Sequence, residues 1–121
     1  MRENPILVVD DDPMVLAAIE AALALRGACV VTASDGREAV RLAAELRPSL
    51  VLLDLNMPVM DGAGFAAEVR RLGMEMPIVL ISGEENLDRW ARSLGAVAYL
   101  RKPFPTQQLT SLVDKTLAAA S

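Results

Sequence analysis

Four polar residues, Asp11, Asp54, Ser82 and Lys102, each follow or end a short hydrophobic run in this 121-residue chain. The runs cover residues 6–9, 50–53, 78–81 and 97–100. If they are strands of one parallel sheet, the four side chains gather at its carboxyl edge, where open α/β sheets bind ligands. Two carboxylates, a hydroxyl and an amine would then share one crevice.

The chemistry of that crevice is suited to a metal ion and a phosphoryl group. Asp10 and Asp11 beside Asp54 crowd negative charge, which a divalent cation and the ammonium group of Lys102 would neutralise. An all-oxygen site suits Mg²⁺. A carboxylate beside such an ion is a competent nucleophile toward phosphorus and would form an aspartyl phosphate. Ser82 and Lys102 can hold the phosphoryl oxygens.

Each of these residues also has a purely structural interpretation. Asp12 precedes a proline and is expected to cap a helix. Ser82 and Glu85 have the spacing of a capping box. Asp54 has no helix start directly after it to cap. Burying a lone carboxylate there would cost free energy unless it had partners, so a functional role is favoured. Lys102 is one of only two lysines among twelve basic residues, and its companions give it meaning.

Composition narrows the function classes. The chain is expected to form one domain over residues 1–121. Its net charge of −4 argues against nucleic-acid binding, and the absence of histidine excludes histidine chemistry. No stretch is apolar enough to span a membrane. The single cysteine, Cys29, is expected to be a buried core residue, and the cytoplasm is the expected compartment.

The order of apolar and helical patterns predicts the fold. A further apolar run covers residues 28–33. Helices are expected at 14–26, 36–46, 61–72 and 106–117, and another is expected to follow the capping box at 82–85 and run to 94. Continuous apolar strands alternating with helices predict a flavodoxin-like α/β fold, (βα)₅, with a doubly wound parallel five-stranded sheet. The expected strand order is 2-1-3-4-5, with a switch point between strands one and three. Asp10, Asp11 and Asp54 are expected to lie at that switch point.

Four motifs together resemble the receiver domain of two-component response regulators, and the chemotaxis regulators in particular. They are Val8-Val9-Asp10-Asp11, Leu52-Leu53-Asp54-Leu55-Asn56-Met57-Pro58 with Met60-Asp61-Gly62, Ile81-Ser82-Gly83 and Lys102-Pro103-Phe104. The resemblance covers essentially the whole chain. It implies a phosphorylation-dependent signalling switch that catalyses only its own phosphotransfer and autodephosphorylation.

The resemblance assigns the metal and phosphoryl roles. Asp54 would accept a phosphoryl group from a phosphohistidine on a sensor histidine kinase or a histidine phosphotransfer protein. Asp11, Asp54 and the backbone carbonyl of Asn56 would bind Mg²⁺ or Mn²⁺, and Asp10 would assist through water. Lys102 would be the counter-charge, with a cis bond to Pro103.

The resemblance also implies a switch. Ser82 would move toward the phosphoryl group, and Tyr99 would turn into the vacated space. The surface of the fourth helix, fifth strand and fifth helix would then change its contact with an unknown downstream protein. Asn56, Glu84 and Gly83 would tune the phosphoryl lifetime.

Assembly and docking are further expectations. A phosphorylation-dependent homodimer is one, and the chain could equally act alone or be cut from a hybrid kinase or larger regulator. The first helix carries Glu20 as its only charge between residues 14 and 25. We expect Met14, Val15, Ala18 and Ala22 to help dock the phosphodonor, although the helix propensity of alanine offers a structural alternative.

Two rival functions predict different chemistry. A haloacid-dehalogenase-like phosphatase would form its aspartyl phosphate on Asp10, but Pro13 stands where that family expects glycine. A flavodoxin-like cofactor binder would need a Ser, Thr and Gly loop after the first strand. Three aspartates at that position would repel the phosphate of FMN.

Overall fold

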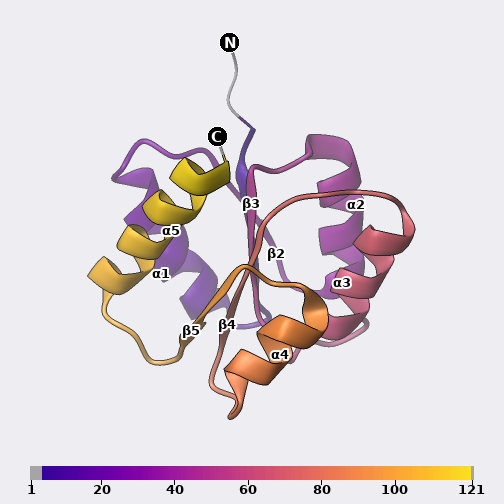
Figure 1. Cartoon of the computed structure of the whole chain (residues 1–121). Coiled ribbons are helices and arrows are strands. Elements are labelled where there is room, and N and C mark those ends of the chain that lie inside the picture. Colours follow the sequence, from indigo (N-terminus) through magenta and orange to yellow (C-terminus); the bar gives the residue numbers. More distant parts are fainter. Residues whose placement is uncertain (1–3, 121) are drawn as a thin grey trace.

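The computed structural model describes residues 4–120, which form a five-stranded parallel sheet between two layers of helices (Figure 1). The strands are β1 (Ile6–Val9), β2 (Val30–Ala33), β3 (Leu50–Leu53), β4 (Ile78–Ser82) and β5 (Ala98–Arg101). The helices are α1 (Pro13–Ala24), α2 (Gly36–Leu46), α3 (Gly62–Arg71), α4 (Leu87–Leu94) and α5 (Thr106–Ala120). The strand order β2-β1-β3-β4-β5 confirms the predicted doubly wound fold.

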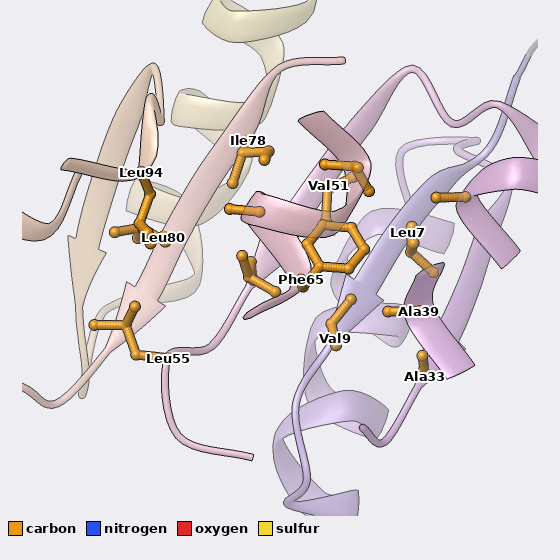
Figure 2. Packing of buried hydrophobic residues seen from close by; sticks show 14 of the residues in the cluster. Leu7, Val9, Ala33, Ala39, Val51, Leu55, Phe65, Ile78, Leu80 and Leu94 are labelled. Carbon is orange, nitrogen blue, oxygen red and sulfur yellow. The ribbon is translucent and has the colours of Figure 1, made fainter. Parts of the chain in front are cut away.

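The helices cover both faces of the sheet, so the core has two halves. α1 and α5 lie on one face, and α2, α3 and α4 lie on the other (Figure 1). The half beneath α2 to α4 is centred on the fully buried ring of Phe65 (Figure 2). Leu109 and Val113 of α5 anchor the other half. Every residue of β1 and β3 is buried because helices cover both of their faces, which explains the unbroken apolar runs.

Three helices begin where an aspartate caps the first turn, and the cap predicted at Asp12 is one of them. Each carboxylate accepts a backbone N–H two or three residues on: Asp12 from Met14 at 2.9 Å, Asp35 from Glu38 at 2.8 Å and Asp61 from Gly64 at 2.8 Å. Such a cap stabilises a helix by about 1 kcal/mol. These caps start α1, α2 and α3 at the carboxyl edge of the sheet, beside the acidic residues.

The capping box expected at Ser82 and Glu85 is wrong. Ser82 is the last residue of β4, and α4 begins only at Leu87, after Asn86 in the left-handed region at φ 60°. The Ser82 hydroxyl oxygen instead accepts the backbone N–H of Glu84 at 3.1 Å. A loop between strand and helix therefore separates the serine from the helix that it was expected to cap.

The expectation that Cys29 is buried is also wrong. Its side chain is exposed, because β2 begins one residue later and Cys29 lies beyond the covered part of the sheet. Its carbonyl accepts the Ile6 N–H at 2.9 Å. Within residues 4–120, none of the helices has the length and apolar character that crossing a bilayer would require.

Candidate functional site

Three carboxylates meet at the carboxyl ends of β1 and β3. Asp10, Asp11 and Asp54 each place one oxygen within 4.8 Å of the others. Asp10 is buried, and its Oδ1 accepts the backbone N–H of Asp12 at 2.9 Å, whereas Asp11 is exposed. The adjacent, parallel pairing of β1 with β3 brings these residues together across more than forty positions of sequence. The sequence therefore predicted this cluster correctly.

Asp54 is almost fully buried, with 6% of its surface exposed. Its backbone N–H donates to the Val9 carbonyl at 2.9 Å, which extends the β1–β3 pairing by one residue. Burial raises the pKa of the Asp54 carboxyl above its usual value, and the negative charge of Asp10 raises it further. Lys102 opposes the increase without cancelling it. The carboxylate is therefore held in a site that disfavours its charge.

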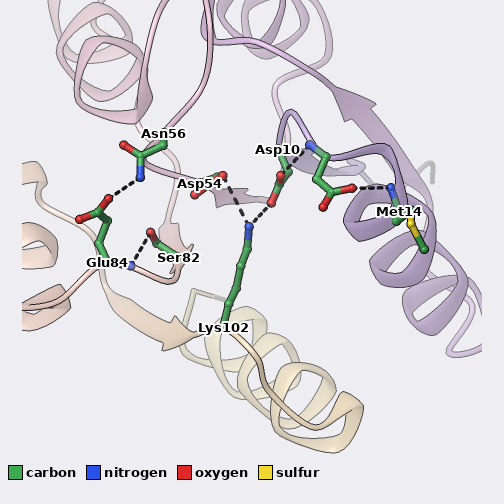
Figure 3. Close-up of polar contacts among 8 residues, drawn as sticks. Asp10, Met14, Asp54, Asn56, Ser82, Glu84 and Lys102 are labelled. Carbon is green, nitrogen blue, oxygen red and sulfur yellow. Dashed lines mark hydrogen bonds and ion pairs between the residues drawn. The ribbon is translucent and has the colours of Figure 1, made fainter.

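Lys102 lies between the two buried carboxylates (Figure 3). Its Nζ is 2.6 Å from Asp10 Oδ2 and 3.5 Å from Asp54 Oδ2. Burial disfavours the ammonium ion, but the hydrogen bond and charge of Asp10, with the charge of Asp54, outweigh it and raise the pKa of Lys102. The Lys102 N–H donates to the Ser82 carbonyl at 2.9 Å, and the bond to Pro103 is cis, as the resemblance implies.

The mouth of the site is formed by the loops after β3 and β4. Asn56 Nδ2 donates to Glu84 Oε1 at 2.6 Å across the two loops (Figure 3). Ser82 is buried, with its hydroxyl oxygen accepting the Glu84 N–H. A side chain at Gly83 would meet no atom within 4 Å, so the mouth is open there. The three expected lifetime residues thus stand together at one opening.

Tyr99 does not join this polar cluster. It pairs with Leu80 across the β4–β5 ladder and leaves 48% of its surface exposed. Arg101, two residues on, is the partner of Ser82 in the same ladder. The structure therefore places Tyr99 on β5, which pairs with the strand that ends in Ser82, and leaves about half of its surface exposed.

Sequence reasoning missed the glycines that shape the loop after β3. A Cβ on Gly62 would lie 2.5 Å from the Asp54 carbonyl oxygen, and one on Gly36 would lie 2.1 Å from the Met60 oxygen. The Gly36 N–H also donates to that oxygen at 2.9 Å. Both glycines follow a capping aspartate, and that helix-start pattern obscured their second role. They allow the loop to pack directly behind the buried Asp54.

The donor set suits a hard divalent cation. Carboxylates from Asp10, Asp11 and Asp54 provide only oxygen ligands, which is what Mg²⁺ prefers, and the exposed Asp11 leaves room for waters. The backbone carbonyl of Asn56 lies two residues beyond Asp54 on the same loop. The residues present therefore fit a magnesium ion.

Curated proteins with similar sequences are named as regulatory proteins. The transcriptional regulatory protein PrrA of Mycobacterium tuberculosis is 42% identical over 114 residues, which cover 93% of this chain and 49% of that protein. The regulatory protein AtoC of Escherichia coli is 34% identical over 120 residues, covering 98% of this chain and 26% of AtoC. The chain thus spans about half the length, or less, of these relatives.

Solved structures share the fold over nearly the whole chain. Chemotaxis protein CheY4 of Vibrio cholerae superimposes with a TM-score of 0.86 at 30% identity, covering 95% of this chain and 99% of that one. The receiver domain of a sensor histidine kinase from Pseudomonas aeruginosa, with a magnesium ion coordinated in its active-site cleft, gives 0.86 at 31% identity, covering 97% and 99%. The model of the response regulator receiver domain matches residues 6–114. This chain therefore belongs to the response regulator receiver family, a family of signalling switches in two-component systems.

Proposed function

We propose that Asp54 accepts a phosphoryl group from a phosphohistidine of a sensor histidine kinase or histidine phosphotransfer protein. The observation that carries this proposal is the placement of Asp54, buried and 3.5 Å from Lys102 Nζ at the centre of the acidic cluster. A carboxylate that attacks phosphorus forms an acyl phosphate, and at this position neighbouring groups can neutralise the charge of the phosphoryl group.

The transfer can be written with every bond accounted for. A carboxylate oxygen of Asp54 attacks phosphorus, and the phosphorus–nitrogen bond breaks. The imidazole leaves with the bonding electrons as a neutral ring, because its second nitrogen carries a proton. Asp11, Asp54 and the Asn56 carbonyl would hold Mg²⁺, with Asp10 assisting through water, and the ion would supply positive charge to the transferring group. Lys102 Nζ, released from part of its contact with Asp10, binds one phosphoryl oxygen, and the Ser82 hydroxyl donates to another.

The rate at which the phosphoryl group is hydrolysed depends on the mouth of the site, between the loops after β3 and β4. Hydrolysis requires a water molecule to reach phosphorus in line with the Asp54 oxygen. The hydrogen-bonded pair of Asn56 and Glu84 stands over one side of that approach, and Gly83 leaves the other side open. We propose that these three residues set the rate of autodephosphorylation by controlling water and charge at this opening.

The output is a change of surface. When the Ser82 hydroxyl turns to the phosphoryl group, it gives up the hydrogen bond from the Glu84 N–H, which frees the loop before α4. Tyr99 then turns inward from its exposed position on β5. The surface formed by α4, β5 and α5 changes in consequence and alters the binding of a downstream protein, with a phosphorylation-dependent homodimer as one form of response.

The phosphodonor would dock beside the first helix. A groove of about 450 Å³ next to Lys102 is lined on one side by Val15, Ala18 and Ala22 of α1. Met14 is 79% exposed at the start of the same helix. An Ala18→Glu variant should therefore slow transfer from the phosphohistidine protein and leave reaction with a small phosphodonor unchanged. If Ala18→Glu reacts as fast as wild type with the phosphohistidine protein as well as with the small donor, docking at this groove is excluded.

The role of the whole protein is a proposal at a coarser level. The relative PrrA is named a transcriptional regulatory protein and AtoC a regulatory protein, and both extend well beyond the matched region. We propose that the receiver controls either a separate protein or an attached output segment. The acidic receiver itself is not expected to contact nucleic acid.

The decisive experiment is chemical. Wild type is incubated with phosphoramidate, whose phosphorus–nitrogen bond resembles that of phosphohistidine, and Mg²⁺, and intact mass is measured. We expect a gain of about 80 Da, one phosphoryl group, on wild type. Asp54→Asn should show none, and Asp10→Asn should retain a reduced gain. An adduct that persists in Asp54→Asn and disappears in Asp10→Asn would instead indicate the phosphatase mechanism.

A further inference from the structure

The first turn of α2 supports the loop that follows Asp54. The Gly36 N–H, at the start of α2, donates to the Met60 carbonyl at 2.9 Å. The same two residues pack so closely that a Cβ on Gly36 would lie 2.1 Å from the Met60 oxygen, the shortest such distance among the seven glycines of the chain. The first N–H groups of a helix have no acceptor within it, so α2 can give this donor to the loop without losing a bond of its own.

The loop is fixed at its base and exposed at its tip. The Gly62 N–H donates to the carbonyl of the buried Leu55 at 2.9 Å, which closes the base. Val59, at the tip, is 71% exposed. Within the described chain, the backbone of residues 56–60 forms a hydrogen bond to another element only through Met60 and α2. The contact with α2 therefore holds the outer part of the loop, and with it the backbone of Asn56.

We infer that Gly36 is a positioning residue for the metal site: through Met60 it sets the place of the Asn56 carbonyl, and it thereby favours Mg²⁺ over the larger Ca²⁺. The inference rests on the proposed function, in which that carbonyl is a metal ligand. Mg²⁺ demands near-octahedral geometry with oxygens at about 2.0–2.1 Å, whereas Ca²⁺ accepts oxygens at about 2.3–2.6 Å in flexible arrangements. A carbonyl on a firmly held loop therefore discriminates between the two ions, and a carbonyl on a displaced loop discriminates less.

A methyl group at position 36 should move the loop and not the helix. Cβ contacts shorter than 3.0 Å essentially never occur, so in Gly36→Ala the methyl carbon and the Met60 oxygen must separate by about 0.9 Å, from 2.1 to 3.0 Å. The start of α2 is held by the Asp35 cap, at 2.8 Å from the Glu38 nitrogen, and by the fully buried Ala39. The exposed tip of the loop can instead move into solvent. β3 and the closed base of the loop keep the phosphoacceptor in place.

The test measures metal affinity separately from phosphorylation. Mg²⁺ and Ca²⁺ are titrated calorimetrically into wild type, Gly36→Ala and Gly73→Ala. Gly36→Ala should weaken Mg²⁺ binding about tenfold, as is typical when a residue that orients a metal ligand is changed, and Ca²⁺ binding by less than about twofold. With saturating Mg²⁺, phosphoramidate should phosphorylate Gly36→Ala at a rate within about twofold of wild type, because Asp54 and Lys102 keep their places.

Gly73→Ala is the matched control. It also adds a methyl group to a glycine, and at φ 74° the alanine strains the backbone and lowers stability. Gly73 follows α3, and a Cβ there would meet no atom within 4 Å, so the loop after β3 is not displaced. Both metal affinities should equal those of wild type, which separates displacement of the loop from a general loss of stability.

Wild type provides a second measurement that does not depend on the folding of Gly36→Ala. In amide NMR spectra, Mg²⁺ should shift the Gly36 resonance along the same saturation curve as that of Asn56, because the ion pulls on the loop to which Gly36 donates. The resonance of Gly73 should not move. A Gly36 resonance that stays in place while that of Asn56 shifts would overturn the inference.

The metal site and the role of Gly36 can fail separately. If wild type binds Mg²⁺ no more tightly than Asp11→Asn, the proposed metal site fails and the role of Gly36 fails with it. If Asp11→Asn weakens binding but Gly36→Ala weakens Mg²⁺ and Ca²⁺ equally, or neither, the metal site stands and only the role of Gly36 is overturned.

Discussion

The side-chain amide of Asn56 donates a hydrogen bond to the carboxylate of Glu84, with 2.6 Å between Nδ2 and Oε1. The two residues lie 28 positions apart on different loops, so this contact joins the loop that carries Asp54 to the loop that follows Ser82. It also fixes a negative charge at the entrance to an acidic site. A phosphodonor that is itself an anion must pass this charge.

Glu84→Gln should accelerate phosphorylation by a small anionic donor. The glutamine retains an oxygen that can accept from Asn56, so the loop geometry is kept and only the charge is removed. A single charge several ångströms away in water is worth a few tenths of a kcal/mol, or about a twofold change in rate. Stopped-flow measurement with phosphoramidate should show this gain at low salt and its decline at high salt.

Glu85→Gln is the matched control for that experiment. Glu85 is the next residue, is exposed, and has no hydrogen bond to Asn56 among the described contacts. It changes the net charge by the same amount. If both variants accelerate the reaction equally, the effect belongs to the overall charge of the protein and not to the entrance.

Lys102→Met should separate metal binding from phosphoryl transfer. The ammonium group lies 2.6 Å from Asp10 and competes with any cation for the carboxylates. Its removal should tighten Mg²⁺ binding about tenfold, equivalent to about 1.4 kcal/mol. The phosphorylation rate should nevertheless fall because the phosphoryl oxygens lose their counter-charge. Calorimetric titration with Mg²⁺ and mass analysis of phosphorylation measure the two effects, and a parallel fall of both would contradict the assignment.

The same substitution should cost stability when no metal is present. Lys102 has a raised pKa, so its stabilising contribution is complete below the ordinary lysine pKa and is lost only as pH rises through the higher folded value. At pH 7 in EDTA, Lys102→Met should lower the free energy of unfolding by about 2 kcal/mol. The double variant with Asp54→Asn should regain part of this loss in urea titrations. No recovery would mean that charge repulsion is not the cause.

The strands and the acidic cluster were predictable because the same physical feature produces both. β1 and β3 are covered on both faces, so their residues are all apolar until the sheet edge, and the first polar residues, Asp10 and Asp54, mark that edge. Parallel pairing then makes their proximity a consequence of topology. Edge strand β5 alternates between half-buried and exposed residues, so no unbroken apolar run marks its ends. Its position was predicted one residue too early, at 97–100.

Loop contacts were not predictable in this way. The spacing of Ser82 and Glu85 fits a capping box, but the chain uses those residues in a loop that delays α4 to Leu87. The bond between Asn56 and Glu84 depends on how two irregular loops meet, which neither periodicity nor charge pattern encodes. These contacts control the mouth, so the roles proposed for them depend on the structure.

Asp54→Asn should stabilise the metal-free protein at neutral pH. Burial and the nearby Asp10 raise the pKa of Asp54, so the folded state disfavours its charge. For a group with a raised folded pKa, the relative stabilisation is present at low pH and is lost as pH rises through the folded value. The neutral asparagine avoids this loss and should gain on the order of 1 kcal/mol at pH 7. Urea titrations in EDTA should show the difference shrinking as pH falls toward the acidic range. A constant difference would exclude the ionisation of Asp54 as its origin.

Val59→Gly should stabilise the fold by relieving backbone strain beside the site. Val59 has φ 68° and is 71% exposed, and the Met60 N–H donates to the Pro58 carbonyl at 2.7 Å around it, in the strained form of a three-residue turn. A β-branched residue in this region costs about 1–3 kcal/mol, whereas the added chain entropy of glycine costs about 0.5–1 kcal/mol. The expected net gain is about 1 kcal/mol in urea titrations. Val97→Gly is the control, because Val97 is similarly exposed without a positive φ and should only lose stability. Losses in both variants would show that the conformation of Val59 carries no strain.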